Sequence, residues 1–337
     1  MLNLPFAKLC GHRQNCRSKG TMLFNITIVL MLLCPARAQA EPLRIGVLTP
    51  GMAFAPVLQG FREGLSSRGY KEGTGVKFIV EDTNGSMTSL ALPTANLLAA
   101  KPNMLYAVTT AHAVTAKQAT ASVPIVYAWV GDPVQTKLIA NYGASNNNLT
   151  GISTASDALS GKRLEALLLV APKTKRLLAI VSPKEYVAQS SFRHLEEAAK
   201  KLGVQVVRRE ASTEAELKLV LQETPKGSVD AVYHIPSYLG SYIHLLIEKA
   251  RQDKIPLVVH EDSMTVKGAL LSYGPDFQAV GVQSARLAAK ILKGEKPESI
   301  PSETPEKFLL VLNLSTARAI GLKIPREVLE QADRLVE

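Results

Sequence analysis

Few side chains in this sequence are placed to carry acid–base or metal chemistry. The densest group is His260, Glu261 and Asp262, where an imidazole and two carboxylates follow one another. A metal site needs further ligands at fixed spacing, and the other histidines are scattered along the chain. Asp132 and Glu261 form the most plausible acid–base pair of an enzyme, but no nucleophile or cofactor loop accompanies them. We therefore expect no catalytic residue, no metal site and no cofactor.

Motifs for nucleotide binding and for serine hydrolysis are incomplete. A phosphate-binding loop that ended at Lys162 would need a glycine where the chain has Ser156. The Gly73-Thr74-Gly75 segment precedes a strand-like run, whereas the dinucleotide fingerprint follows a strand. The Gly-x-Ser-x-Gly turn of many hydrolases does not occur. These departures count against a nucleotide-dependent enzyme and against a serine hydrolase.

The first forty residues have the composition of an export signal. Five basic residues and no acidic one lie there, and an apolar run spans residues 26–34. That run is too short for a bilayer-spanning helix, which needs about 20 residues. Ala38 and Ala40 provide the small residues of a cleavage site. We therefore expect a signal peptide over residues 1–40, cleavage after Ala40 and a periplasmic protein.

The expected cleavage changes the composition of the mature chain. All three cysteines, Cys10, Cys16 and Cys34, lie in the removed segment, so neither disulfides nor thiol chemistry are expected. Five of the 39 basic residues and none of the 29 acidic ones lie there, which lowers the net charge from +10 to +5. Without a basic stripe, this excess does not indicate nucleic-acid binding. Alternatives for the segment are translation from Met22, a lipid anchor on Cys34 and a buried core helix.

Short strand-like runs alternate with amphipathic helical stretches from residue 43 onward, which predicts parallel sheets covered by helices. The first series has strands at 43–48, 76–81, 104–108 and 125–129, and helices at 55–68, 89–100 and 111–121. An Asn-rich stretch, 141–150, interrupts the alternation and is the expected first crossing between two lobes. The second series has helices at 159–169, 190–202, 214–223 and 239–252, and strands at 177–181, 205–209, 231–235 and 257–259.

The last part of the chain is expected to cross between the lobes again. An apolar run at 269–272 is followed by a helix at 277–292, a second run at 308–312 and a short helical tail. We predict an α/β protein with two doubly wound parallel-sheet lobes joined by a multi-strand hinge. The expected N-terminal lobe is 41–152 plus about 274–305, and the expected C-terminal lobe is 153–273 plus about 306–337.

The candidate ligand positions follow from this architecture, because open parallel sheets bind ligands beyond the carboxyl ends of their strands. They are Thr49, Pro50, Met52, Thr109, Thr110, Ala111 and Asp132 in the first lobe, and Ser182, Ser237, Tyr238, Glu261 and Asp262 in the second. Hydroxyls and free amides at helix starts favour a carboxylate, and acids opposite them would suit a zwitterion. The alternative is that Thr109 and Thr110 only cap a helix and that Asp132 only caps a turn.

Short segments spread over nearly all of the mature chain carry a family likeness. They are Gly60-Phe61-Arg62-Glu63-Gly64-Leu65, Gly69-Tyr70, Gly73, Ile125-Val126-Tyr127-Ala128, Asp132-Pro133-Val134, Asn148-Leu149-Thr150-Gly151, Lys267-Gly268-Ala269-Leu270, Gly281, Ile291-Leu292-Lys293-Gly294-Glu295-Lys296-Pro297, Asn313-Leu314 and Ala319-Ile320-Gly321. In order and spacing, these segments resemble bacterial ABC-transporter substrate-binding proteins of the tryptophan/tyrosine-binding-like group. Those proteins have the type I periplasmic-binding-protein fold, which the resemblance therefore implies here.

The resemblance also implies a function. A monomeric protein would close about its hinge on an amino acid or related small carboxylate and present it to an ABC permease and its ATPase. Two departures put the ligand in question: Ser237 and Tyr238 stand where the family often has an aspartate, and Gln135-Thr136-Lys137 replaces a glycine-rich segment. The alternatives are a periplasmic sensor for a membrane kinase and a cleft enzyme that uses Asp132 and Glu261.

Overall fold

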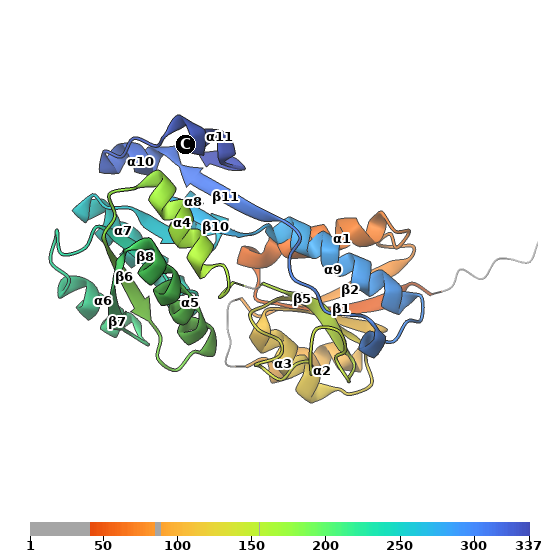
Figure 1. Ribbon diagram of the computed structural model, residues 1–337. Helices are drawn as coiled ribbons and strands as arrows, with labels where there is room; N and C mark the ends of the chain where they lie inside the picture. Colours follow the sequence, from red (N-terminus) through yellow and green to blue (C-terminus); the bar gives the residue numbers. More distant parts are fainter. Residues whose placement is uncertain (1–40, 85–88, 155) are drawn as a thin grey trace, which may run out of the picture. The chain divides into compact units, whose positions relative to one another are not determined.

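The structure is a computed structural model that describes residues 41–84, 89–154 and 156–337 (Figure 1). The expected signal peptide, its cleavage after Ala40 and the three cysteines lie outside these residues. Glu41–Glu337 is one of the two units into which the chain divides, and it is described here by itself. Within the described ranges, no helix is both long and apolar enough to cross a membrane.

The first sheet has five parallel strands in the order β2-β1-β3-β4-β5. Their bounds are β1 Leu43–Thr49, β2 Val76–Asp82, β3 Met104–Val108, β4 Ile125–Val130 and β5 Leu149–Ser153. The helices between them are α1 Ala55–Ser66, preceded by the short turn η1 Met52–Phe54, α2 Ala91–Ala99 and α3 Thr110–Ala119. Every residue of β3 and β4 is buried, as is typical of parallel strands that are covered on both faces.

The second sheet has seven strands in the order β12-β11-β10-β9-β8-β6-β7. Their bounds are β6 Arg176–Val181, β7 Gln205–Glu210, β8 Ala231–His234, β9 Leu257–Val259, β10 Leu271–Pro275, β11 Phe308–Asn313 and β12 Arg334–Val336. The accompanying helices are α4 Ser160–Val170, α5 Tyr186–Leu202, α6 Glu214–Gln222, η2 Tyr238–Tyr242, α7 Ile243–Asp253, α8 Asp262–Val266, α10 Leu314–Ile320 and α11 Arg326–Gln331. The pairing of β10 with β11 is antiparallel, so this sheet is mixed and not wholly parallel as predicted.

The chain passes between the two sheets three times. It leaves the first sheet after β5, returns after β10 into α9 (Phe277–Leu292), and leaves again after η3 (Pro297–Ser299) to form β11. Helix α9 packs along α1 (Figure 1). A Cβ on Gly60 would collide with the carbonyl oxygen of Gln278, and one on Gly281 with that of Val57. Glycine is therefore required at both positions for the two helix backbones to approach so closely.

The structure departs from the sequence-based expectations at several elements. Strand β5 begins within the Asn-rich stretch that was expected to be the crossing, and the crossing comes after the strand. Helix α5 begins at Tyr186, four residues earlier than expected. Helix α8 and strand β12 were not expected. Helix α8 is shorter than two helical turns, and β12 is too short to show an alternation of apolar and polar residues. The remaining predicted helices and strands are present with bounds shifted by a few residues.

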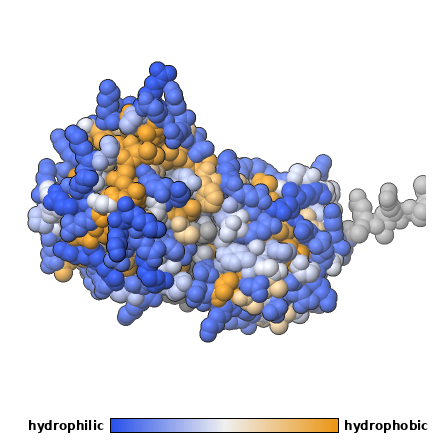
Figure 2. Space-filling view, in the orientation of Figure 1, coloured by the Kyte–Doolittle hydropathy of each residue, from blue (hydrophilic) through white to orange (hydrophobic). Residues whose placement is uncertain are grey.

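The face drawn in Figure 2 is mostly hydrophilic, with hydrophobic side chains gathered in the region of α4 and α11. Leu169, near the end of α4, is half exposed. A groove of about 560 Å³ lies beside it, lined among others by Val170, Pro172, Leu322 and Pro325. This groove lies at the amino ends of the second sheet's strands, away from the edge where parallel sheets bind ligands.

Candidate functional site

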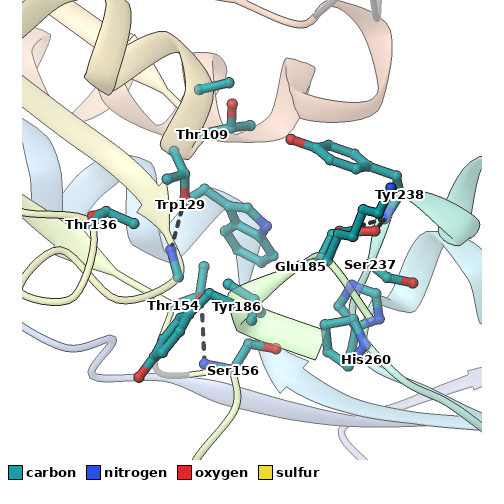
Figure 3. A pocket seen from close by; sticks show the side chains of 16 residues that line it. Thr109, Trp129, Thr136, Thr154, Ser156, Glu185, Tyr186, Ser237, Tyr238 and His260 are labelled. Carbon is teal, nitrogen blue, oxygen red and sulfur yellow. Dashed lines mark hydrogen bonds between the residues drawn. The ribbon is translucent and has the colours of Figure 1, made fainter. Parts of the chain in front are cut away.

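A cavity of about 440 Å³ lies where the loops after six strands converge (Figure 3). The loops follow β3, β4 and β5 of the first sheet and β6, β8 and β9 of the second. The lining residues are Thr109, Thr110, Ala111, Trp129, Gly131, Thr136, Thr154, Ser156, Lys184, Glu185, Tyr186, Val187, Pro236, Ser237, Tyr238 and His260. Both walls are thus built from carboxyl ends of strands, and the volume falls in the range of about 300 to 1,000 Å³ that small-molecule sites occupy.

The first-sheet wall begins with Thr109, which has a left-handed φ of +82°. Its hydroxyl lies 2.7 Å from Nδ1 of His112, and Nε2 of His112 lies 3.1 Å from the Thr83 hydroxyl. Burial lowers the pKa of His112 to about 4, against an opposing effect of Asp82, so the ring is neutral and donates from one nitrogen only. His112 thereby fixes Thr109 at the start of α3. The Thr110 hydroxyl accepts a hydrogen bond from the backbone N–H of Gly131 at 3.2 Å.

Trp129 provides the aromatic surface of this wall. The register of β4 with β5 shifts between Ala128 and Val130, and Trp129 itself has a φ of +59°. Such a bulge re-aims a side chain that would otherwise alternate with its neighbours. The indole stacks on Phe277 of α9, with ring centroids 3.9 Å apart, and meets the edge of Phe54 at 6.0 Å. Figure 3 shows the indole in the middle of the cavity wall.

The second-sheet wall carries the acidic group of the cavity, Glu185. Both of its carboxylate oxygens accept from the backbone N–H of Tyr238, at 3.0 and 3.3 Å. Burial raises the pKa of Glu185, although hydrogen bonds from Ser182 and Tyr238 act in the opposite direction. Tyr186 and Tyr238 are 40% and 60% exposed as whole residues and both line the cavity, so they offer aromatic surface beside the carboxylate.

His260 completes this wall and is held by the buried His234 and by the largely buried Glu261. Its Nε2 lies 3.3 Å from Oε1 of Glu261, and its Nδ1 lies 3.2 Å from Nδ1 of His234. Burial acts to raise the pKa of Glu261, but the interactions with His260, Ser263 and Lys267 together outweigh it, and the pKa is lowered. Burial together with His260 and Arg163 holds the pKa of His234 well below its usual value. The carboxylate of Glu261 therefore contacts the His260 imidazole and does not line the cavity.

The base of the cavity is fixed by a buried guanidinium. Arg163 is fully buried and donates to the backbone oxygen of Ser156 at 2.7 Å, to the Ser156 hydroxyl at 2.9 Å and to the backbone oxygen of Tyr273 at 2.7 Å. Ser156 lines the cavity after β5, whereas Tyr273 belongs to β10. Arg163 thus joins two of the segments by which the chain passes between the sheets.

Five of the predicted ligand positions line the cavity: Thr109, Thr110, Ala111, Ser237 and Tyr238. The alternative that Thr109 and Thr110 only cap a helix is wrong, because neither hydroxyl caps α3. The Thr109 hydroxyl contacts His112, and the Thr110 hydroxyl accepts a hydrogen bond from the Gly131 N–H. The two walls come together as expected from the carboxyl-end rule.

The other predicted positions do not line the cavity. Thr49 is buried and accepts from Gly51, Pro50 follows it in the same loop, and Met52 is 88% exposed. Asp132 accepts hydrogen bonds from the backbone N–H groups of Val134 and Gln135, so it caps a turn, as the alternative interpretation expected. Ser182 is buried, and its backbone oxygen accepts a hydrogen bond from the Glu185 N–H. Asp262 forms an ion pair with Arg334 at 3.1 Å. With Glu261 behind His260, the cavity contains neither member of the supposed acid–base pair.

Sequence reasoning missed several lining residues, above all Trp129 and Glu185. The apolar run predicts Trp129 as the last residue of a strand, and nothing in the neighbouring residues indicates the bulge. The sequence predicts that α5 starts at Ser190, which leaves Glu185 in the middle of a loop, whereas the helix starts at Tyr186. A start at Tyr186 places Lys184 and Glu185 directly at the carboxyl end of β6, where the rule that found the other residues would have included them.

Comparisons with known proteins agree with this architecture. Residues 45–336 match the family model described as ABC transporter substrate binding protein. The tyrosine-binding protein of Clostridioides difficile (strain R20291) is 27% identical over 268 residues, which cover 79% of this chain and 76% of that protein. A conserved domain protein from Vibrio cholerae has a structure with a TM-score of 0.78 and 27% identity, covering 88% of this chain and 100% of its own.

The fold is shared with a second solved structure at lower identity. An ABC domain from Streptococcus pneumonia in complex with L-Trp has a TM-score of 0.78 at 22% identity, and the match covers 88% of this chain and 100% of that one. Other solved structures with the same architecture include a leucine-binding protein from Thermotoga maritima, which has a TM-score of 0.57 at 17% identity and a match that covers 77% of this chain and 85% of that one. These structural neighbours confirm the predicted type I periplasmic-binding-protein fold. Because the family model spans nearly all described residues, the chain belongs to the ABC transporter substrate-binding protein family.

Proposed function

We propose that this protein is the extracytoplasmic solute-binding component of an ABC uptake transporter and that it captures one small ligand in the cavity. The observation that carries the proposal is that loops from both sheets line a single cavity. A ligand that contacts both walls stabilises the arrangement in which they face each other, so binding is coupled to closure about the crossing segments. Lobes of 41–152 plus about 274–305 and 153–273 plus about 306–337 would be the moving parts.

The cavity chemistry favours an amino acid or a related carboxylate as ligand. The start of α3 offers backbone N–H groups and the hydroxyls of Thr109 and Thr110 to an anionic group. Trp129, Tyr186 and Tyr238 offer aromatic surface to an apolar side chain. The 27% identity with a tyrosine-binding protein supports the same ligand class.

The cellular setting follows from the N-terminal sequence and the family. Cleavage after Ala40 would release a monomeric protein into the periplasm, where it would deliver its ligand to a membrane permease and its ATPase. No turnover of the ligand is expected, because the acids considered for catalysis, Asp132 and Glu261, are engaged elsewhere.

A thermal-shift screen tests the proposal. The purified protein is unfolded and refolded to remove any bound ligand, and amino acids and small carboxylates are then added singly. Ligand at 100 times its dissociation constant should stabilise the folded protein by about 2.7 kcal/mol and raise the melting temperature. Recovery of the ligand unchanged supports a transport receptor. A bound ligand that is converted to product, or no stabilisation by any member of the panel, contradicts the proposal.

A further inference from the structure

The Glu185 carboxylate is a negative charge in the cavity wall with no cation beside it. Among the residues that the structure describes, Glu185 takes part in no ion pair. Its hydrogen bonds come from the backbone N–H of Tyr238 and from Ser182, both neutral donors. A ligand that fills the cavity would remove more water from this carboxylate, and burying a charge without a partner is strongly unfavourable.

The other charged groups on the same wall do not compensate Glu185. His260 lies against Glu261, so any positive charge on its ring is already opposed by a carboxylate. Lys184 also lines the cavity, but its side chain is exposed and does not pair with Glu185 in the described structure. The positive partner that Glu185 requires on closure is therefore expected to come from the ligand.

The surroundings of Glu185 fit an organic cation. Figure 3 shows Glu185 beside Tyr238, with Tyr186 also in the cavity wall. Both rings are partly exposed, and aromatic faces attract ammonium groups. The backbone contact with Tyr238 fixes the carboxylate before the ligand arrives, so little side-chain entropy is lost on binding.

We propose that Glu185 recognises an ammonium group of the ligand and that this contact determines specificity for amino-group-containing ligands. The inference rests on the function proposed above and assigns one residue of the second-sheet wall to it. The start of α3, on the first-sheet wall, would hold the carboxylate of the same ligand. A ligand that lacks the ammonium group then leaves Glu185 uncompensated and gains little from contact with the second wall.

Ligand titrations that use Trp129 as the reporter test this assignment. Trp129 is the single tryptophan of the sequence and lines the cavity, so its fluorescence reports binding at this site. The probes are L-tyrosine, L-phenylalanine and L-leucine, each with the 2-hydroxy acid in which a hydroxyl replaces the ammonium group. The wild-type protein should bind an amino acid about 10- to 100-fold more tightly than its hydroxy acid, the usual loss of a charged hydrogen bond.

Glu185→Gln separates recognition from a structural role. Glutamine keeps an oxygen that can accept from Tyr238, so the loop should retain its shape. The variant should lose about 10- to 100-fold in affinity for the amino acid, and Glu185→Asp should restore part of the loss. Affinity for the hydroxy acid should not fall and should rise if anything, because Glu185→Gln removes the charge that this ligand leaves uncompensated. Glu197→Gln, at an exposed position of α5, the helix that Glu185 precedes, is the matched control and should change neither affinity.

Each outcome decides between the two proposals. Equal binding of amino acid and hydroxy acid by the wild-type protein overturns the role of Glu185 and leaves the receptor function standing. An equal loss for both ligands in Glu185→Gln also overturns it, because that pattern indicates a purely structural residue. If neither class of probe binds, the proposed ligand class itself is wrong, and the assignment of Glu185 fails with it.

Discussion

Two residues of the cavity, Thr109 and Trp129, have left-handed backbones although neither is glycine. Such conformations cost about 1 to 3 kcal/mol each and persist only where the surroundings impose them. His112 holds the hydroxyl of Thr109, and Phe277 stacks on Trp129. The strain aims a hydroxyl and an indole at the place where a ligand would lie. A sequence reveals neither conformation, since both residue types usually adopt ordinary strand or helix dihedrals.

Thr110 and Asp132 follow adjacent strands, yet the structure predicts different effects for their substitution. Thr110→Ala removes a cavity hydroxyl and should weaken ligand binding by about 1 to 3 kcal/mol. Asp132→Ala removes the acceptor of two turn N–H groups and should lower the free energy of unfolding by about 1 to 2 kcal/mol, with a smaller effect on affinity. Calorimetric titration and urea unfolding of both variants measure the two quantities. A larger loss of affinity in Asp132→Ala than in Thr110→Ala would contradict these roles.

At the scale of elements, helix α3 owes its position to His112, which links Thr109 before the helix to Thr83 after β2. The buried ring has a pKa of about 4 in the folded protein, whereas an unfolded histidine titrates near 6.5. The unfolded state therefore takes up the proton first as the pH falls. The stability associated with the neutral ring is complete above pH 6.5 and is lost as the pH falls from about 6.5 to 4.

His112→Gln should remove this pH dependence. Between pH 7 and pH 4 the wild-type free energy of unfolding should fall by about 3 kcal/mol more than that of the variant. Urea unfolding at several pH values measures the difference. His234 also has a lowered pKa and contributes to acid destabilisation in both proteins, so only the difference between them is diagnostic. The control is His194→Gln, at an exposed position, whose free energy of unfolding should follow the wild-type curve against pH. If the curves of His112→Gln and the wild type run parallel instead, the prediction for His112 is wrong.

Elements with a strong pattern were predictable, and those with a weak one were not. Strands β3 and β4 are continuous apolar runs, and α9 has a clear amphipathic face, so each was expected at nearly its observed bounds. Strand β5 is short, contains Gly151 and follows an Asn-rich segment, so it resembles a loop. The carboxyl-end rule found the two walls of the cavity, but which loop residues face inward depends on bulges and helix starts. These are set by packing and not by local pattern.

For the whole molecule, the chain connects the two sheets at three crossings. The segment after β5 and strand β10 are joined by the guanidinium of Arg163, through Ser156 and Tyr273. Arg163 forms no ion pair within the described ranges, so neutral oxygens alone satisfy its buried charge. Such a charge is held in place only if each donor finds an acceptor, which makes the geometry of the crossings strict.

Replacing Arg163 should therefore affect stability and binding together. Arg163→Met keeps an apolar stem but leaves the backbone oxygens of Ser156 and Tyr273 without a donor, and should lower the free energy of unfolding by about 3 kcal/mol. Arg163→Lys should recover only part of this, because an ammonium cannot reproduce the planar fork of the guanidinium. Because Ser156 lines the cavity, ligand affinity should fall in the same order. Urea unfolding measures the stability, and fluorescence titration measures the ligand affinity. Arg193→Met, at an exposed position, is the control. An unfolding midpoint in urea for Arg163→Met equal to that of the control would show that the crossings keep their geometry without the guanidinium.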